Sequence, residues 1–250
     1  MNFQFQVQKF EEQWIQGALE DFYEDGWIED VLYWVKGGKE AMVYCCKAPT
    51  ELGVDLIAAK IYRPRQNRAM KNYGLYQQGR HLTTDKRLLR ALKKKTRRGK
   101  QFEDSTWLRH EYKTLQTLYN MGADVPQPFE LSGNTILMEY IGDEHIVAPL
   151  LQEITLEPGE AQPFFDRIMN NIELFLSCDF IHGDLSAFNI LYWDGDFKII
   201  DFPQAVDPLN HPSAFNLLIR DVERICQYFE RYGMQESAIH LATDLWERYM

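Results

Sequence analysis

The chain has 250 residues, of which 45% are hydrophobic and 26% charged, and its formal net charge is −10. This is the balance of a globular protein with a sizeable core, so one or two domains are expected. No stretch approaches the roughly 20 apolar residues that span a bilayer, and the first residues lack the basic and apolar runs of a signal peptide. The composition therefore excludes a membrane-spanning protein and predicts a cytoplasmic location. The four cysteines have neither metal-ligand nor disulfide spacing and are expected to be small buried apolar residues.

Charge is unevenly distributed along the chain. Between Lys60 and Lys100 there are fifteen Lys or Arg and one acid, Asp85, so this segment carries +14 and the remainder −24. A basic block on an acidic body predicts a docking surface for an anionic partner. A solvated helical surface would explain the charge alone equally well.

The first part of the chain predicts a helix followed by a small antiparallel sheet. Residues 8–24 have apolar side chains near helical spacing, and this helix is expected to end near Gly26. The apolar runs 27–35, 41–48 and 55–62 are separated by glycine-containing turns, which indicates three antiparallel strands.

Beyond the basic block, the pattern predicts a helix, a hairpin and then mainly helices. Residues 105–121 have apolar side chains at spacings of three and four, with Ser105 as the expected N-cap. Two short strands, 129–132 and 134–141, are separated by Gly133. Further helices are expected at 164–180, 212–231 and 235–249. Strands followed by helices indicate an α+β fold.

The most informative stretch, residues 180–206, places polar side chains between short apolar runs. Asp184 and Asn189 are separated by four residues, and a hairpin over residues 190–200 is expected to bring Asn189 beside Asp201. Their oxygens would suit a hard cation such as Mg²⁺, with Asp184 close by to orient a nucleophile. Caps or turns would not explain this combined spacing, so it indicates a functional site.

Other polar residues of this stretch have simpler explanations. Asp194-Gly195-Asp196 has the composition of a tight turn. His182 is expected to be a core histidine that orients the loop backbone.

The spacing of Asp184, Asn189 and Asp201 matches the catalytic loop and metal-binding aspartate of kinases, which predicts nucleotide-binding residues upstream. Lys60 lies in an apolar strand that should not bury a lone ammonium, and it matches the kinase lysine that holds the α and β phosphates. Glu111, on the inward face of the following helix, is its expected partner. A solvent-exposed Lys60 is the alternative.

The glycine-rich loop of kinases, G-x-G-x-x-G-x-V, is only partly present. When Val43 is aligned with the valine of that motif, Lys36, Gly38 and Ala41 occupy the three glycine positions. The turn from Gly38 to Ala41 is still expected to direct backbone N–H groups toward phosphate.

Residues 138–141 fit the hinge between the two lobes of a kinase. Backbone groups of Glu139 and Ile141 would then hydrogen-bond adenine. A plain strand end explains these residues almost as well.

Longer motifs resemble the RIO kinase family. They are GKEAMVY (38–44), HGDLSAFNILY (182–192), IDFPQAVDP (200–208), HPSAF (211–215) and RDV (220–222). The similarity runs from about residue 30 to residue 231. Gly183 and Pro203 stand where ordinary protein kinases have Arg and Gly, which makes the resemblance specific.

This resemblance implies a two-lobed protein-kinase-like fold with an antiparallel-sheet N-lobe and a mainly helical C-lobe. It also implies ATP with Mg²⁺ or Mn²⁺, Asp184 as catalytic base, and Asn189 and Asp201 as metal ligands. The ATP-binding residues would be Lys60, Glu111, Gly38, Val43, Glu139 and Ile141. The implied activity is serine/threonine phosphorylation, including of the protein itself, or an ATPase switch in small-ribosomal-subunit maturation in which Asp201 accepts phosphate transiently.

The expected organisation is a single RIO-type domain over residues 1–250. Residues 1–138 would form the N-lobe, including the leading helix and a basic insertion at 63–104, followed by the hinge at 139–141 and the C-lobe at 142–250. The basic insertion would bind ribosomal RNA, a pre-ribosomal particle or phosphate.

The numbers of residues before the first kinase strand and after Asp201 indicate which branch of the family the chain resembles. About 30 residues precede the first kinase strand, which favours the branch without an N-terminal winged helix. Only 49 residues follow Asp201, too few for an activation segment and the large substrate platform of ordinary protein kinases.

Two other functional classes remain open. Small-molecule kinases of the aminoglycoside and choline kinase type also use H-G-D-x-x-x-x-N followed by Ile-Asp, although Pro203-Gln204-Ala205 and the short C-terminal region favour the RIO type. A scaffold gated by nucleotide is the other class, but it would not need a base beside the metal site. The protein acceptor is not predicted by the sequence.

Overall fold

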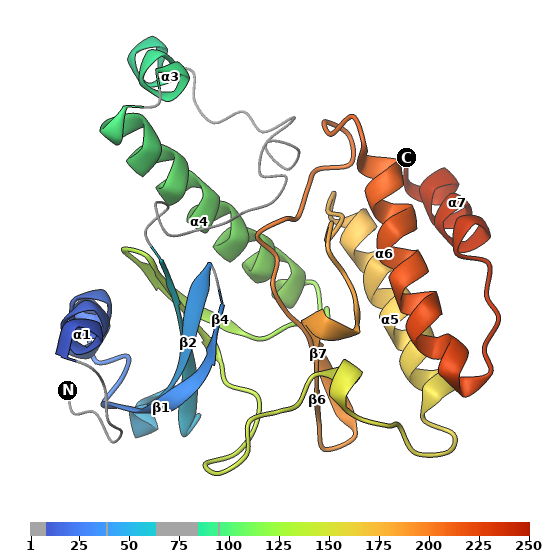
Figure 1. The fold of residues 1–250 in the computed structure, drawn as a ribbon, viewed down its shortest axis with the longest axis horizontal. Coiled ribbons are helices and arrows are strands. Elements are labelled where there is room, and N and C mark those ends of the chain that lie inside the picture. The colour runs from blue at the N-terminus through green and yellow to red at the C-terminus, as the bar shows by residue number, and fades with distance from the viewer. Residues whose placement is uncertain (1–8, 39, 64–84, 95) are drawn as a thin grey trace. The chain divides into compact units, whose positions relative to one another are not determined.

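A computed structural model describes residues 9–38, 40–63, 85–94 and 96–250 (Figure 1). The chain divides into two compact units. The first contains the described residues of Met1–Lys71, Leu82–Tyr112 and Pro126–Val147, and the second contains Lys113–Val125 and Ala148–Met250. The chain thus passes from the first unit to the second more than once, whereas the sequence-based scheme has a single division at residues 139–141.

The first unit is built on a five-stranded sheet in the order β1-β2-β3-β5-β4, with every neighbouring pair antiparallel. Its strands are β1 (Asp30–Gly37), β2 (Ala41–Lys47), β3 (Leu56–Tyr62), β4 (Pro128–Ser132) and β5 (Thr135–Glu139), with a short 3-10 helix at Thr50–Leu52. The predicted three-stranded meander and separate hairpin are both confirmed. Pairing of β3 with β5 joins them into one sheet.

Helix α1 (Lys9–Glu24) packs its apolar side against this sheet (Figure 1). Ile15, Leu19 and Phe22 are buried in a core that also contains Tyr44 of β2. Full burial of side chains of this size contributes about 1.5–3 kcal/mol each. The helix ends just before Gly26, whose φ of 74° no helix can continue, as the sequence predicts.

Two helices begin within the basic segment, α3 (Lys86–Lys93) and α4 (Arg97–Asn120). The prediction that the second begins at residue 105 is wrong, because α4 begins at Arg97 and Ser105 lies inside it. Ser105 donates its hydroxyl proton to the carbonyl of Phe102 at 2.9 Å, which satisfies the hydroxyl without a cap. Residues 64–84 and 95 of the expected basic insertion lie outside the described residues.

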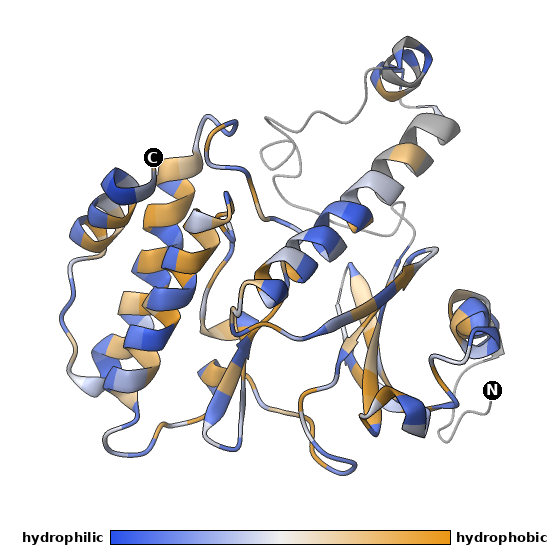
Figure 2. Cartoon of the chain, turned by 180° about the vertical axis from the view of Figure 1, so that it is seen from behind, coloured by the Kyte–Doolittle hydropathy of each residue, from blue (hydrophilic) through white to orange (hydrophobic). Residues whose placement is uncertain are grey.

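The second unit is mainly helical. Its helices are α5 (Ala161–Ser177), α6 (Ala214–Phe229) and α7 (Ala238–Tyr249), its two-stranded sheet is β6 (Ile190–Trp193) with β7 (Asp196–Ile199), and its 3-10 helices are Leu151–Glu153, Ala187–Asn189 and Glu230–Tyr232. Apolar and polar residues alternate around α5 and α6 in Figure 2, as expected for helices with one buried side. The three predicted helices and the hairpin are confirmed.

The turn between β6 and β7 has the predicted chemistry. Asp194 and Gly195 both adopt positive φ, at 49° and 75°. Two consecutive positive φ values suit the right-handed twist of a hairpin, and Asp and Gly tolerate them best.

Cys45, Cys46 and Cys226 are buried as free thiols, whereas Cys178 is half-buried. Among the described residues, no helix is both long and apolar enough to cross a membrane.

Candidate active site

Lys60 and Glu111 form a shielded ion pair within the first unit. The Nζ of Lys60 on β3 lies 2.8 Å from Oε1 of Glu111 on α4, and the two side chains are only 13% and 4% exposed. The expected pairing is therefore present, and a solvent-exposed Lys60 is excluded. Loss of either partner would leave an uncompensated buried charge, which is strongly destabilising.

Tyr62 extends this ion pair and was not identified from the sequence. It is buried, and its hydroxyl donates to Oε2 of Glu111. Lys60 and Tyr62 lie on the same face of β3 because they are two residues apart. That spacing was a usable signal, since a buried tyrosine beside a carboxylate normally donates to it.

The other expected nucleotide-binding residues of the first unit lie near the ends of strands. Val43 is paired with Lys60 in the ladder between β2 and β3. Gly38 donates its N–H to the carbonyl of Ala41 at 2.9 Å. That N–H therefore closes the hairpin, so any phosphate contact of this turn would come from its other N–H groups.

The expected hinge residues follow directly on β5. Glu139 ends this strand, and its N–H donates to the carbonyl of Gln127 at 2.8 Å. Because this bond uses the N–H of Glu139, the expected contact of Glu139 with adenine would be made by its carbonyl. Ile141 lies two residues beyond the strand and is half-buried.

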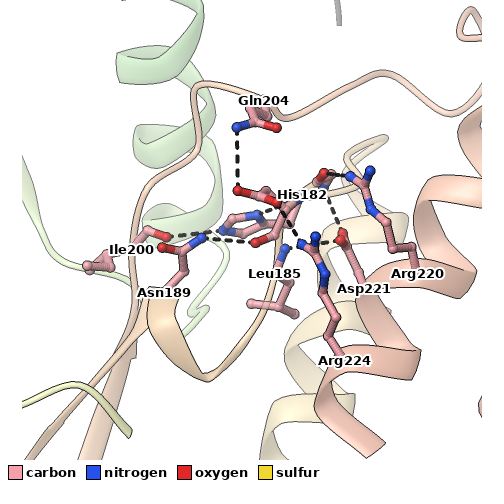
Figure 3. A network of polar contacts seen from close by, with 10 residues as sticks. His182, Leu185, Asn189, Ile200, Gln204, Arg220, Asp221 and Arg224 are labelled. Atoms are coloured by element: carbon pink, nitrogen blue, oxygen red, sulfur yellow. Dashed lines mark hydrogen bonds and ion pairs between the residues drawn. The ribbon is translucent and has the colours of Figure 1, made fainter. Parts of the chain in front are cut away.

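In the second unit, the β6–β7 hairpin brings together the polar residues predicted from the sequence. The N–H of Ile200 donates to the carbonyl of Asn189 at 2.9 Å, so Asn189 lies beside the residue that precedes Asp201. The Nδ2 of Asn189 donates to the carbonyl of Asp184 at 2.9 Å (Figure 3). This bond directs the amide nitrogen toward the protein, so the amide oxygen is the group that would bind a cation.

Asp201 adopts a left-handed backbone with φ of 75°. A non-glycine residue rarely adopts this conformation, and such residues cluster at functional sites. The side chain of Asp201 is exposed, whereas the adjacent Phe202 is buried against His182 and Phe175. The left-handed conformation thus occurs between a strand and an anchored aromatic ring.

His182 is the core histidine that the sequence predicts. It is 2% exposed, its Nδ1 accepts the N–H of Asp184 at 3.3 Å, and its Nε2 lies 3.1 Å from the carbonyl of Ile200. Since Nδ1 accepts, Nε2 carries the proton and the ring is neutral. Burial lowers the pKa of His182, which favours the same neutral form. The ring therefore links the segment around Asp184 to the end of the hairpin.

Asp221 on α6 holds the backbone on both sides of Asp184. Its two carboxylate oxygens accept the N–H of Gly183 at 2.7 Å and of Leu185 at 3.0 Å (Figure 3). The neighbouring Arg220 donates to the carbonyl of Gly183. These contacts fix the loop to α6.

The role of Asp221 was not predicted from the sequence, although a signal was present. Asp221 is four residues from both Leu217 and Ile225, on the buried stripe of α6. An acid at such a position must have hydrogen-bond partners, because a buried carboxylate without them would be costly.

In the part of the chain that the structure describes, two residues contact the side chain of Asp184. Arg224 of α6 places Nη1 2.6 Å from Oδ1 of Asp184, and Gln204 places Nε2 3.4 Å from Oδ2. Neither contact was predicted, because they join residues 40 and 20 positions apart along the chain.

This set of residues is suited to orient a hydroxyl and to bind a hard cation. No group of three or more His, Cys, Asp and Glu side chains in the described ranges is arranged to hold a metal ion. Asn189 and Asp201 instead offer the one amide and one carboxylate oxygen that suit Mg²⁺ when phosphate and water supply the other ligands. The donor set therefore fits this ion.

Comparison with known proteins agrees with these motifs. The model of the RIO domain matches residues 42–242. The serine/threonine-protein kinase RIO1 of Caenorhabditis elegans is 31% identical over 131 residues, which is 52% of this chain and 26% of that protein. The corresponding kinase rio1 of Schizosaccharomyces pombe is 28% identical over 215 residues, or 83% of this chain and 39% of that protein.

An archaeal relative is more similar in size. The RIO-type serine/threonine-protein kinase Rio1 of Thermoplasma acidophilum is 30% identical over 129 residues, which is 52% of this chain and 66% of that protein. The chain thus spans between about a quarter and two fifths of the two eukaryotic relatives and close to two thirds of the archaeal one.

Proposed function

The chain belongs to the RIO domain family, and we propose that it is an ATP- and Mg²⁺-dependent phosphotransferase that phosphorylates serine or threonine, including its own, or hydrolyses ATP as a switch. The relatives are named serine/threonine-protein kinases. The observation that carries the proposal is the arrangement of Asp184, Asn189 and the residue before Asp201 around the β6–β7 hairpin. A pure scaffold would not need a base beside residues that can hold a metal.

Each residue has a definite part in this proposal. An ammonium has three N–H donors, so Lys60 can contact the α and β phosphates of ATP while it keeps Glu111. Asp184 accepts the proton of the attacking hydroxyl, and Asn189 and Asp201 hold the metal. When bound, Mg²⁺ neutralises charge on the phosphate oxygens.

The proposal also includes contacts of ATP with the strand end at Glu139 and with the turn at Gly38. Adenine would meet the carbonyl of Glu139 and the N–H of Ile141, while Val43 packs near the base and the backbone around Gly38 lies near phosphate. Mn²⁺ can replace Mg²⁺ where the ligands are oxygens. A cytoplasmic location is part of the same proposal and rests on the sequence alone.

The experiment that tests the proposed activity follows the label of γ-³²P-ATP incubated with the purified protein and Mg²⁺. We expect label on serine or threonine of the protein, on an added protein acceptor, or in free phosphate. Label on an added aminoglycoside or choline would instead favour a small-molecule kinase. Unchanged ATP in every mixture would contradict the proposal and favour a nucleotide-gated scaffold.

The basic segment supports a further part of the proposal, an anionic partner such as ribosomal RNA or a pre-ribosomal particle. In its described part, Arg87, Arg90, Lys93 and Lys94 are exposed on or next to α3. Arg87→Glu with Arg90→Glu should weaken binding of a ribosomal RNA fragment and reduce the slope of log affinity against log salt by about 1–2. Lys113→Glu, an exposed change outside the segment, is the control. Equal affinities of the two variants would contradict RNA binding by α3.

A further inference from the structure

Arg224 makes the strongest contact to the carboxylate of Asp184. Its Nη1 lies 2.6 Å from Oδ1, a distance typical of a short charge-assisted hydrogen bond. The contact of Gln204 with Oδ2 is long, at 3.4 Å, and comes from a neutral amide. Arg224 and Gln204 thus contact different oxygens of this carboxylate. The two oxygens of Asp184 are therefore held very unequally.

This ion pair contributes little to stability. Both side chains are 37% exposed, and ion pairs at that exposure typically contribute between 0 and about 1 kcal/mol. The backbone around Asp184 is already fixed by Asp221, whose oxygens accept the N–H groups of Gly183 and Leu185. Those bonds do not determine how the carboxylate of Asp184 is rotated. Among the described residues, Arg224 makes the stronger of the two side-chain contacts that orient this carboxylate.

Building on the proposed function, we propose that Arg224 is a positioning residue for phosphoryl transfer. It holds Oδ1 of Asp184 so that Oδ2 is directed to the acceptor hydroxyl. The acceptor hydroxyl then replaces Gln204 as the partner of Oδ2. In the transfer step the hydroxyl proton passes to Oδ2, the hydroxyl oxygen forms a bond to the γ phosphorus, and the bond from that phosphorus to the β–γ bridging oxygen breaks. The bond electrons leave with ADP.

The location of Arg224 on α6 supports this role. About one turn of the helix carries Arg220, Asp221 and Arg224. Each of them contacts the segment 183–185. Arg220 and Asp221 contact backbone groups, whereas Arg224 contacts the side chain of Asp184. One helix thus fixes both the loop and the orientation of its carboxylate.

The test compares kcat and the KM for ATP in the wild type, Arg224→Ala and Arg224→Lys. Misplacement of a catalytic group by about 1 Å can reduce rates by two orders of magnitude, so we expect kcat of Arg224→Ala to fall about ten- to a hundredfold. The KM for ATP should change by less than about twofold, because Arg224 acts on the acceptor step. Arg224→Lys should recover part of the lost rate, and added guanidinium should partly restore Arg224→Ala.

Arg248→Ala is the matched control. Arg248 is an exposed arginine of the neighbouring helix α7, and its Nη1 lies 2.5 Å from Oε1 of Glu173 on α5. This variant should keep the wild-type kcat. A kcat for Arg224→Ala at or above that of the wild type, in protein that melts normally, would overturn the inference and indicate that the ion pair restrains Asp184. Failure of the proposed function looks different, because the wild type itself would then not consume ATP, and the inference would fall with it.

Discussion

Asp221 is a buried titratable residue that is hydrogen-bonded to the loop that carries Asp184. Burial raises the pKa of Asp221 to about 7, and the N–H groups of Gly183 and Leu185 together with the neighbouring arginines only partly offset it. An aspartate in the unfolded chain has a pKa of about 4. Between pH 4 and pH 7 the folded protein therefore holds a proton that the unfolded chain releases. The free energy of unfolding should fall as pH rises through this range and level off above it.

Asp221→Asn removes this titration and should remove its part of the pH dependence. We expect the Tm of the wild type, relative to that of Asp221→Asn, to decline from about pH 4.5 to about pH 7 and then stay constant. Thermal melts in a series of buffers measure it. Glu223→Gln, an exposed change on the same helix, shows the effect of losing a carboxylate outside the core. Parallel curves for the wild type and Asp221→Asn would refute the assignment.

Tyr62 should matter more than an ordinary buried tyrosine because its hydroxyl donates to a charged oxygen of Glu111. Tyr62→Phe leaves that oxygen short of a partner in a buried site, which should lower the free energy of unfolding by about 1–3 kcal/mol. Tyr112→Phe is the control, since Tyr112 donates at 3.1 Å to the neutral carbonyl of Phe129 and should cost about 1 kcal/mol. Urea unfolding distinguishes the two. Equal losses would mean that the charge of Glu111 contributes nothing to the bond.

At the scale of elements, the β6–β7 hairpin is what brings Asn189 next to the residue before Asp201. Its turn depends on Gly195, which has φ of 75° and no heavy atom within 4 Å of where a Cβ would lie. Any cost of a side chain there is conformational rather than steric. Gly17, in the middle of α1, also has open space around it but lies in a helix.

These two glycines should respond in opposite directions to alanine. Gly195→Ala should lower the free energy of unfolding by about 1 kcal/mol, because alanine pays about 1–2 kcal/mol for a left-handed backbone. Gly17→Ala should raise it by about 0.5–1 kcal/mol, because glycine is the weaker helix former. Urea titrations measure both changes. If Gly195→Ala were as stable as the wild type, the turn could not have the left-handed backbone described above.

Local patterns in the sequence predicted most of the elements. Strands β1 to β3, the β6–β7 hairpin and the helices of the second unit follow from apolar periodicity and glycine turns. The start of α4 was missed because Ser105 has the chemistry of a cap while the residues before it are polar, and polarity alone does not distinguish a solvated helix from a loop. The pairing of β3 with β5 was not predicted, because it joins strands far apart in the chain.

The candidate site was predictable where residues are close in sequence or matched a known motif. Asp184, Asn189 and Asp201 lie within one stretch, and Lys60 with Glu111 was expected from the kinase pattern. The contact of Arg224 with Asp184 depends on how α6 packs, which the order of residues does not reveal. Polar residues on a helix are by default expected to face solvent.

At the scale of the whole molecule, the residues expected for phosphoryl transfer are divided between two compact units. The first unit holds Lys60 with Glu111, and the second holds Asp184, Asn189 and Asp201. Helix α4 contributes residues to both units and carries Glu111. Binding of ATP and its turnover should therefore be separable by mutation, because the lysine proposed to bind phosphate and the proposed base belong to different units.

The most direct test measures ATP affinity and the rate of ATP consumption in parallel for the wild type, Asp184→Asn and Asp201→Asn, with Mg²⁺ or with EDTA. We expect turnover by the wild type only with Mg²⁺, and a loss of about a hundredfold or more in both variants. Asp184→Asn should still bind ATP with wild-type affinity, because Asp184 acts on the acceptor. Turnover by Asp184→Asn at the wild-type rate, or tight binding by the wild type without any turnover, would contradict the account.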